Sequence, residues 1–390
     1  MQGAGFPLLE RGYDGAPFIY LDSASTTPKP RPVIDAVVRY YETLGANVHR
    51  GTHPLAEAAT EAYERARHRV AALIGAQPAE IVFTRNATDS FNLLARALNL
   101  TADDEVVFPA SEHHSNYMPW RVDAKAVLVD IDDEAVPKWQ QLAAKITKRT
   151  RLVSVAHVSN VTGVIAPVEE WIATAHAAGV PVMIDASQSI AHLPIDVRSL
   201  DVDFMGFSSH KMFGPNGVGV LYVRRDRFAE LGLGNVGGGM VALHQEDRFE
   251  PLEAPLRYEA GTPNIEGVIG LGAAVDYLQG IGMTRIAAHS RALAEQLMQG
   301  LAGIPSATVL GRSAAERIAL ATVSLPLPAM SQQDIARLLA DAHGIFVSGG
   351  YHCAHVLHHR LHLAGTLRAS AQIYNDAADI EAFVAALREL

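Results

Sequence analysis

The sequence predicts an α/β protein: a large domain built on a mostly parallel sheet of seven strands, followed by a smaller α+β domain. Between residues 80 and 225, short apolar runs rich in β-branched residues alternate with segments of helical period. Such alternation is typical of parallel strands joined by helices that cover both faces of a sheet. After about residue 305, strand-like runs are fewer and are mixed with helices, which indicates a second lobe.

Each strand expected in the large sheet is a short apolar segment between turns or helices. The seven segments are residues 81–84, 105–109, 125–131, 151–158, 180–185, 204–208 and 218–223. Apolar residues at helical spacing predict connecting helices over 87–98 and 168–179, and the second ends on a glycine suited to a helix C-terminus.

The remaining elements follow from the same two periodicities. Helices are expected over 55–76, 264–282, 283–301, 331–342 and 377–388, and strands over 319–326 and 345–348. The domain division expected from these elements is an N-terminal segment (1–30) that packs with the small domain, a large domain (31–280) and a small C-terminal domain (281–390).

Composition and charge exclude several kinds of protein. The 390 residues are 49% hydrophobic and carry a net charge of −10 with no long basic run, so a nucleic-acid partner is not expected. No apolar stretch approaches the ~20 residues that cross a bilayer, and the N-terminus lacks the features of a signal peptide. The single cysteine excludes an internal disulfide and a multi-cysteine metal site. We therefore expect a soluble, cytoplasmic protein without a membrane partner.

Polar side chains follow directly after five of the expected strands. These clusters are residues 84–88, 112–114, 157–160, 185–188 and 208–211. Each one alone has an ordinary explanation as a helix cap, a turn or a solvated surface. Because the carboxyl ends of parallel strands meet along one rim of a sheet, the five together predict a ligand site.

The residue types in these clusters suit an aromatic aldehyde that carries a ring nitrogen and a phosphate. Asp185 would hold the ring nitrogen protonated, and Lys211 in a desolvated pocket would bond to the aldehyde carbon. A histidine would cover the ring, and a threonine at a helix N-terminus would receive the phosphate. Pyridoxal 5'-phosphate (PLP) is the cofactor with such partners.

A dinucleotide-binding loop is the competing interpretation of the glycines after Lys211. The stretch GPNGVG (214–219) has the glycine content, but such a loop must open a helix. Here LYVRR follows, which is a strand pattern. A strand–turn–strand is therefore predicted instead.

Longer motifs carry a resemblance to a known family. They are YLDSAS (20–25), NVHRG (47–51), FTRNATDSFNL (83–93), EHHSNYMPW (112–120), HVSNVTG (157–163), DASQS (185–189), FSSHKMFGPNGVG (207–219), RYEAGTPN (257–264), HCA (352–354) and LRASAQIYN (367–375). With these motifs the chain resembles the PLP-dependent fold-type I enzymes of the class V aminotransferase group. More narrowly, it is similar to the group II (SufS-type) cysteine desulfurases and selenocysteine lyases.

The resemblance implies four residues around the cofactor ring. Lys211 matches the lysine that holds PLP, and Asp185 matches the carboxylate at the pyridine nitrogen. Gln188 matches the donor to the ring oxygen, and His113 matches the imidazole stacked on the ring.

The resemblance also implies residues around the phosphate. Thr88, Ser208 and His210 match phosphate ligands within one subunit. Thr262 matches a residue that reaches the phosphate of the neighbouring subunit, which implies a homodimer with shared sites.

On the substrate side, the resemblance implies a carboxylate anchor and a nucleophile. Arg368 matches the anchor, a role that also suits a guanidinium fork, and Asn160 matches an amide near substrate or cofactor. Cys353 matches the sulfur-accepting nucleophile, and the histidines beside it favour its thiolate. Its ordinary interpretation is a small buried hydrophobe. The chain departs from the family at Ser348, usually arginine, and at Tyr351, usually histidine or asparagine.

The activity implied by the resemblance converts L-cysteine to L-alanine, with a persulfide on Cys353 that passes to an acceptor protein of iron–sulfur cluster assembly. Three alternatives stay open: a PLP-dependent lyase, epimerase or transaminase that does not use Cys353; a cofactor-free hydrolase using Cys353, a histidine and Asn160; and a non-catalytic scaffold. No metal site is expected. The histidines of 355–362 are expected to be solvated or to face a dimer partner.

Overall fold

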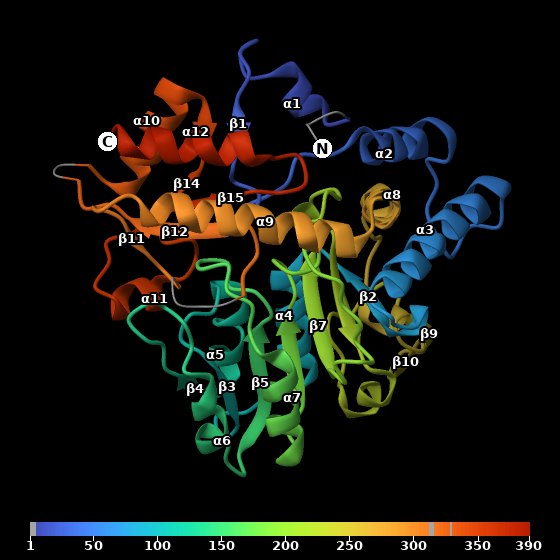
Figure 1. Cartoon of the computed structure of the whole chain (residues 1–390). Coiled ribbons are helices and arrows are strands. Elements are labelled where there is room, and N and C mark those ends of the chain that lie inside the picture. The colour runs from blue at the N-terminus through green and yellow to red at the C-terminus, as the bar shows by residue number, and fades with distance from the viewer. Residues whose placement is uncertain (1–4, 312–315, 328–329) are drawn as a thin grey trace.

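The computed structural model describes residues 5–311, 316–327 and 330–390. Its largest element is a seven-stranded sheet in the order β2-β8-β7-β6-β5-β3-β4 (Figure 1). The strands are β2 Ile81–Thr84, β3 Glu105–Pro109, β4 Lys125–Val129, β5 Thr150–Ala156, β6 Val182–Asp185, β7 Phe204–Ser208 and β8 Gly219–Val223. All neighbours are parallel except β8, which is antiparallel to both β2 and β7. The predicted α/β class and all seven strands of the large sheet are confirmed.

Helices flank this sheet and extend beyond it. They are α1 Pro7–Arg11, α2 Arg31–Thr43, α3 Pro54–Leu73, α4 Ala87–Ala97, α5 Trp120–Asp123, α6 Leu142–Lys145, α7 Val168–Ala177, α8 Ile265–Ile281, α9 Met283–Ala302, α10 Gln332–His343, α11 His355–Arg360 and α12 Ala377–Arg388. The helix predicted to end on a glycine does so, because Gly179 follows α7 with a φ of 73°. Within the described ranges, no helix is both long enough and apolar enough to cross a membrane.

Smaller sheets lie outside the large one. An antiparallel sheet has the order β11-β12-β15-β14, with β11 Thr308–Val309, β12 Leu320–Ser324, β14 Ser348–Gly350 and β15 Thr366–Ser370. The predicted strand 345–348 is divided in two, since β13 (Ile345–Phe346) pairs with β1 (Ile19–Tyr20) while β14 pairs with β15. A hairpin of β9 (Val241–His244) and β10 (Phe249–Pro251) was not predicted.

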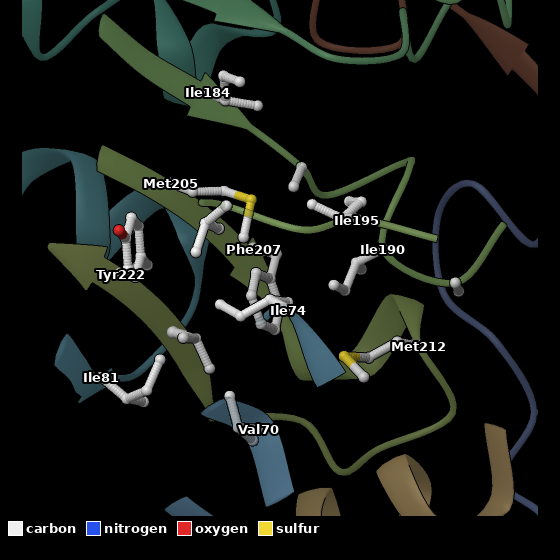
Figure 2. Packing of buried hydrophobic residues seen from close by; sticks show 14 of the residues in the cluster. Val70, Ile74, Ile81, Ile184, Ile190, Ile195, Met205, Phe207, Met212 and Tyr222 are labelled. Atoms are coloured by element: carbon white, nitrogen blue, oxygen red, sulfur yellow. The ribbon is translucent and has the colours of Figure 1, made fainter. Parts of the chain in front are cut away.

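The core packing fixes where strand β7 ends. Met205 and Phe207 belong to the largest buried cluster, on one face of the sheet (Figure 2), while Phe204 packs on the other face. Gly206 faces Phe91 of α4 so closely that a Cβ there would lie 2.5 Å from the ring. Side chains therefore pack tightly against both faces of β7. This packing fixes where the strand ends, and hence where Ser208 and the residues after it lie at the rim of the sheet.

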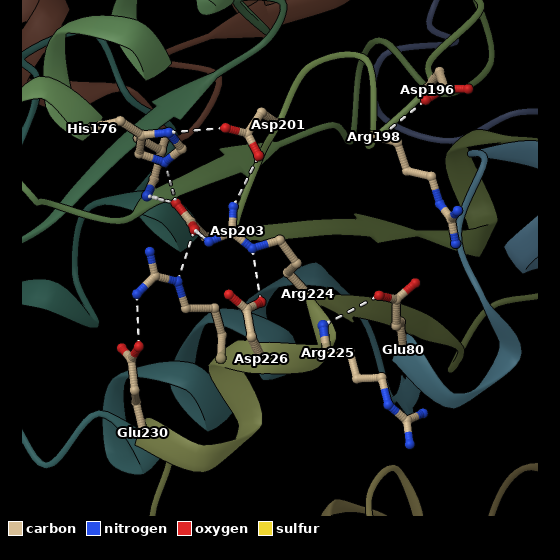
Figure 3. Close-up of polar contacts among 12 residues, drawn as sticks. Glu80, His176, Asp196, Arg198, Asp201, Asp203, Arg224, Arg225, Asp226 and Glu230 are labelled. Carbon is tan, nitrogen blue, oxygen red and sulfur yellow. Dashed lines mark hydrogen bonds and ion pairs between the residues drawn. The ribbon is translucent and has the colours of Figure 1, made fainter.

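Asp203 lies just before β7, at the opposite end of the strand, and basic side chains surround its buried carboxylate (Figure 3). Its side chain is 0% exposed, and Oδ1 accepts a hydrogen bond from Arg227 Nε at 2.8 Å and forms an ion pair with Arg224 Nη2 at 2.8 Å. Oδ2 accepts from the backbone N–H of Val182 at 2.7 Å and pairs with His176 Nε2 at 2.8 Å. The charge is therefore paired although it is fully desolvated.

Replacing Asp203 by asparagine should lower the free energy of unfolding by about 1–3 kcal/mol, because an uncharged amide cannot accept all of the hydrogen bonds made to this buried carboxylate. Urea unfolding followed by circular dichroism measures the change. The control is Asp226→Asn, which removes a carboxylate 2.8 Å from the same Arg224 but with a side chain 66% exposed. That control should cost about 0–1 kcal/mol, and equal losses in the two variants would contradict the burial argument.

Candidate active site

The rim where the parallel strands end opens on a cavity of about 480 Å³. Every residue predicted for the site except Thr262 lines it: Thr88, His113, Asn160, Asp185, Gln188, Ser208, His210, Lys211, Cys353 and Arg368. Residues from the strand ends of the large sheet thus meet residues from β14, β15 and the loop that follows β14.

Lys211 and Asp185 both line the cavity. Strands β6 and β7 are parallel neighbours with Asp185 in register with Gly206, and Lys211 ends a 3₁₀ turn (Ser209–Lys211) just after β7. Burial lowers the pKa of Lys211, against the pull of Asp185, and burial raises the pKa of Asp185. The amine is therefore more readily neutral than an exposed lysine, which suits a nucleophile or a base.

His113 and Gln188 also line the cavity. His113 caps a short 3₁₀ helix (His114–Asn116), and its Nδ1 accepts from the backbone N–H of Ser115 at 3.1 Å. Burial, with Lys211 nearby, lowers the pKa of His113 to about 3, so its imidazole is neutral. Gln188 donates from Nε2 to the carbonyl of Ala24 at 2.9 Å.

A group of lining residues around the start of helix α4 is suited to an anion. Helix α4 begins there, with Asn86 as its N-cap, and the hydroxyl of Ser208 accepts from the backbone N–H of Ala87 at 2.8 Å. The hydroxyl of Thr88 lies 2.6 Å from that of Ser115. Burial lowers the pKa of His210 to about 4. Hydroxyls at a helix N-terminus favour a phosphate group.

Arg368 lies on β15 and also lines the cavity, with its guanidinium held in place. It donates from Nη1 to the carbonyl of Asn160 at 2.9 Å and from Nη2 to the hydroxyl of Ser25 at 2.8 Å. Asp22 lies 3.4 Å from Nη2. The buried Nε has no hydrogen-bond partner among the described residues.

Cys353 is exposed in a loop that several contacts fix. His352 and Cys353 both have left-handed backbone, with φ of 48° and 55°, which is strained for residues other than glycine. The carbonyl of Cys353 accepts from the backbone N–H of His114 at 2.8 Å, and Asn160 Nδ2 donates to the carbonyl of His352 at 2.8 Å. Asn160 therefore links the cysteine loop to Arg368.

The histidines near Cys353 are engaged in packing. Nε2 of His352 lies 3.1 Å from the carbonyl of Thr366, and His355 is stacked between Tyr351 (ring centroids 4.4 Å apart) and His114 (4.8 Å). His358 is fully buried, so the prediction that the histidines of 355–362 are solvated or at a dimer surface is wrong for this residue. Nowhere in the described ranges do three or more potential ligand side chains gather as a metal ion would require.

Thr262 lies elsewhere. It lines a separate cavity of about 210 Å³ with Asn47, His49, Arg50 and Glu259. Three further residues that line the cavity, Ser25, Asn86 and Ser115, were given no individual role, although each lies in one of the quoted motifs. Asn86 also belongs to the predicted cluster 84–88, and an asparagine just before a helical run is a typical N-cap.

The cavity fits PLP on its donor set. A buried carboxylate with a raised pKa is stabilised by a cation such as a protonated ring nitrogen, and a lysine with a lowered pKa lines the same space. A neutral imidazole and a helix N-terminus with hydroxyls also line it. Asp185, Lys211, His113 and Ser208 supply these groups.

Comparisons of sequence and structure with known proteins agree with each other. The aminotransferase class-V family pattern matches residues 19–383. A probable cysteine desulfurase of Synechocystis is 40% identical over 98% of this chain and 93% of its own length. Two solved cysteine desulfurases are similar in structure. One, from Thermococcus onnurineus, has a TM-score of 0.90 and 37% identity over 95% of this chain and 94% of that one. The other, from Escherichia coli, has a TM-score of 0.89 and 36% identity over 99% and 96%.

Proposed function

Since this chain belongs to the aminotransferase class-V family, we propose that it is a PLP-dependent cysteine desulfurase that uses Cys353 as the sulfur acceptor. The observation that carries the proposal is that its only cysteine lines the same cavity as Lys211 and Arg368. One small substrate in this cavity could then meet all three groups. The lysine would hold the cofactor, the guanidinium would bind an amino-acid carboxylate, and the thiol would accept the sulfur.

We assign the cofactor contacts residue by residue. Lys211 would hold PLP, Asp185 would pair with its ring nitrogen, Gln188 would contact its ring oxygen and His113 would cover its ring. Thr88, Ser208 and His210 would hold its phosphate. PLP supplies a sink for the electron pair released when a proton leaves the Cα of an amino acid.

The protein residues perform the remaining steps. Arg368 binds the substrate carboxylate, and Lys211, favoured as the neutral amine, takes the Cα proton. The thiolate of Cys353 attacks the substrate sulfur: an S–S bond forms, the Cβ–S bond breaks, and its electron pair stays on the substrate. Protonation of the carbon skeleton then yields alanine, and the sulfur is left as a persulfide on Cys353.

We also propose a homodimer in the cytoplasm. Thr262, which lies outside the cavity of its own chain, would contact the phosphate of the neighbouring subunit. An exposed free thiol such as Cys353 stays reduced in a reducing compartment. The persulfide, being exposed, would pass to an acceptor protein of iron–sulfur cluster assembly.

The proposal is tested by incubating PLP-loaded protein with a panel of L-amino acids and a reducing thiol. Alanine formed from L-cysteine, and from none of the sulfur-free amino acids in the panel, supports it. Ser348, in register with Arg368 on the neighbouring strand, stands where the resemblance implies an arginine, and this favours a second candidate. Turnover of another amino acid without alanine from L-cysteine would indicate that candidate, a PLP-dependent lyase, epimerase or transaminase.

Replacing Arg368 by lysine should raise the KM for L-cysteine and lower kcat/KM by roughly 10- to 100-fold, because a planar charge-assisted contact of about 1.5–3 kcal/mol is lost. Steady-state kinetics measure the change. L-cysteine methyl ester is the control, since it lacks the carboxylate charge and should distinguish the two proteins little. An equal loss with the ester would show that Arg368 does not bind the carboxylate.

A further inference from the structure

The backbone carbonyl just before the catalytic lysine collects an unusual number of donors. The oxygen of His210 accepts from the backbone N–H of Thr27 at 3.0 Å and from its hydroxyl at 3.1 Å. It also accepts from the hydroxyl of Thr26 at 3.1 Å and from Lys29 Nζ at 3.0 Å. A carbonyl oxygen has two lone pairs, so four donors around it make a crowded and strongly held contact.

Lys29 is the charged member of this group. Its Nζ also donates to the carbonyl of Thr27 at 2.6 Å and lies 3.5 Å from the hydroxyl of Thr26. Burial lowers its pKa to about 8, and no carboxylate of the described residues forms an ion pair with it. A half-buried ammonium that is held by backbone carbonyls rather than by a counter-charge is costly to retain, which points to a specific role for its hydrogen bonds.

Residues 26–29 also contact the backbone that follows Lys211. The hydroxyl of Thr27 accepts from the backbone N–H of Phe213 at 2.9 Å, and Phe213 has left-handed backbone with a φ of 69°. The contacts of residues 26–29 therefore fall on residue 210 and on residue 213, on both sides of Lys211. The turn is short, with a hydrogen bond from the N–H of Met212 to the carbonyl of Ser209. Holding its two sides fixes the direction in which Lys211 leaves the backbone.

We propose that Lys29 is a positioning residue for Lys211: its N–H groups hold the His210 carbonyl and so fix the turn that directs the Lys211 amine into the cavity. The inference rests on the proposed function, which gives Lys211 a cofactor to meet. Lys29 does not line the cavity, so it acts through the turn and not on substrate.

The test compares Lys29→Met, which keeps the length of the side chain and removes its donors, with Lys29→Arg, which keeps a donating cation. Cofactor-free protein is mixed with PLP, and the covalent link to Lys211 is trapped with borohydride at successive times and counted by mass. Visible circular dichroism per linked cofactor reports how firmly the lysine and ring are oriented.

In Lys29→Met we expect linkage about 10-fold slower than in wild type, as the loss of a charged hydrogen bond implies. The circular dichroism per cofactor should be weaker, and kcat with L-cysteine should fall about 10-fold with KM little changed. Lys29→Arg should recover most of each loss. A purely structural role would lower the thermal midpoint but leave the linkage rate of folded protein and the circular dichroism per cofactor unchanged.

Linkage rate, circular dichroism and kcat at wild-type values in folded Lys29→Met would overturn the inference while leaving the proposed function intact. If wild type does not link PLP at Lys211, both fall together. If wild type links PLP but makes no alanine from L-cysteine, only the proposed function fails, and the linkage rates still decide the role of Lys29. Should Lys29→Met not fold, Thr26→Val removes another side-chain donor to the same carbonyl, and it should slow linkage in the same direction.

Discussion

Replacing Lys211 by alanine should lower alanine formation from L-cysteine by about 10³-fold or more, since the variant loses the group that moves the Cα proton. It should also lose the covalent link to PLP, so that borohydride treatment adds no cofactor mass to the chain. In wild type, the rate should fall as pH drops through the lowered pKa of Lys211, because the ammonium form has no free electron pair to accept a proton.

The matched control is Lys125→Ala. The side chain of Lys125 is 63% exposed, and it lies at the start of edge strand β4, away from the rim that bears the cavity. Its loss should leave kcat and PLP linkage unchanged. Alanine formation by Lys211→Ala at near wild-type rate would mean that another base performs the proton transfer, and the assignment of Lys211 would be wrong.

Replacing Cys353 by serine should lower alanine formation from L-cysteine by at least about 10²-fold, which corresponds to roughly 2.7 kcal/mol in the barrier. A serine hydroxyl is a far weaker nucleophile toward sulfur than a thiolate, so the Cβ–S bond is not cleaved by this route. Serine keeps a side chain of similar size on the left-handed backbone of the loop. PLP linkage at Lys211 should therefore be unchanged, in contrast to the Lys211 variant.

The Cys353 result separates the two candidate functions. A lyase, epimerase or transaminase of the same fold would turn over its amino acid equally well with serine at position 353. Wild-type turnover of any amino acid by Cys353→Ser would therefore contradict a role for the thiol. It would leave the PLP assignment intact, because the thiol is not among the cofactor contacts.

The large sheet and most of the cavity were predictable because both follow from local pattern. Apolar runs with β-branched residues are typical of buried strands, and parallel strands bring their carboxyl ends to one rim. That rule is sufficient to place Asp185 and Lys211 in one cavity once β6 and β7 are neighbours. Arg368 lies on β15 and Cys353 in the loop after β14. Only the resemblance to a known family predicted that these two residues belong to the same site.

The rest depended on contacts between residues far apart in the chain. The pairing of β13 with β1 and of β14 with β15 divides an apolar run that looks like one strand. The hairpin of β9 and β10 is largely exposed, so its sequence lacks the apolar alternation that marks a strand. The histidines beside Cys353 contact Thr366, Tyr351 and His114. The spacing of the histidines within 352–362 does not predict these partners.

The most direct test of the central claim is one turnover of PLP-loaded protein with a single equivalent of L-cysteine and no reducing thiol. Alanine and the mass of the Cys353 peptide are measured in the same sample. The proposed function predicts alanine and one added sulfur on Cys353 in equal amounts. Alanine without added sulfur on Cys353, or linked PLP with neither product, would contradict it.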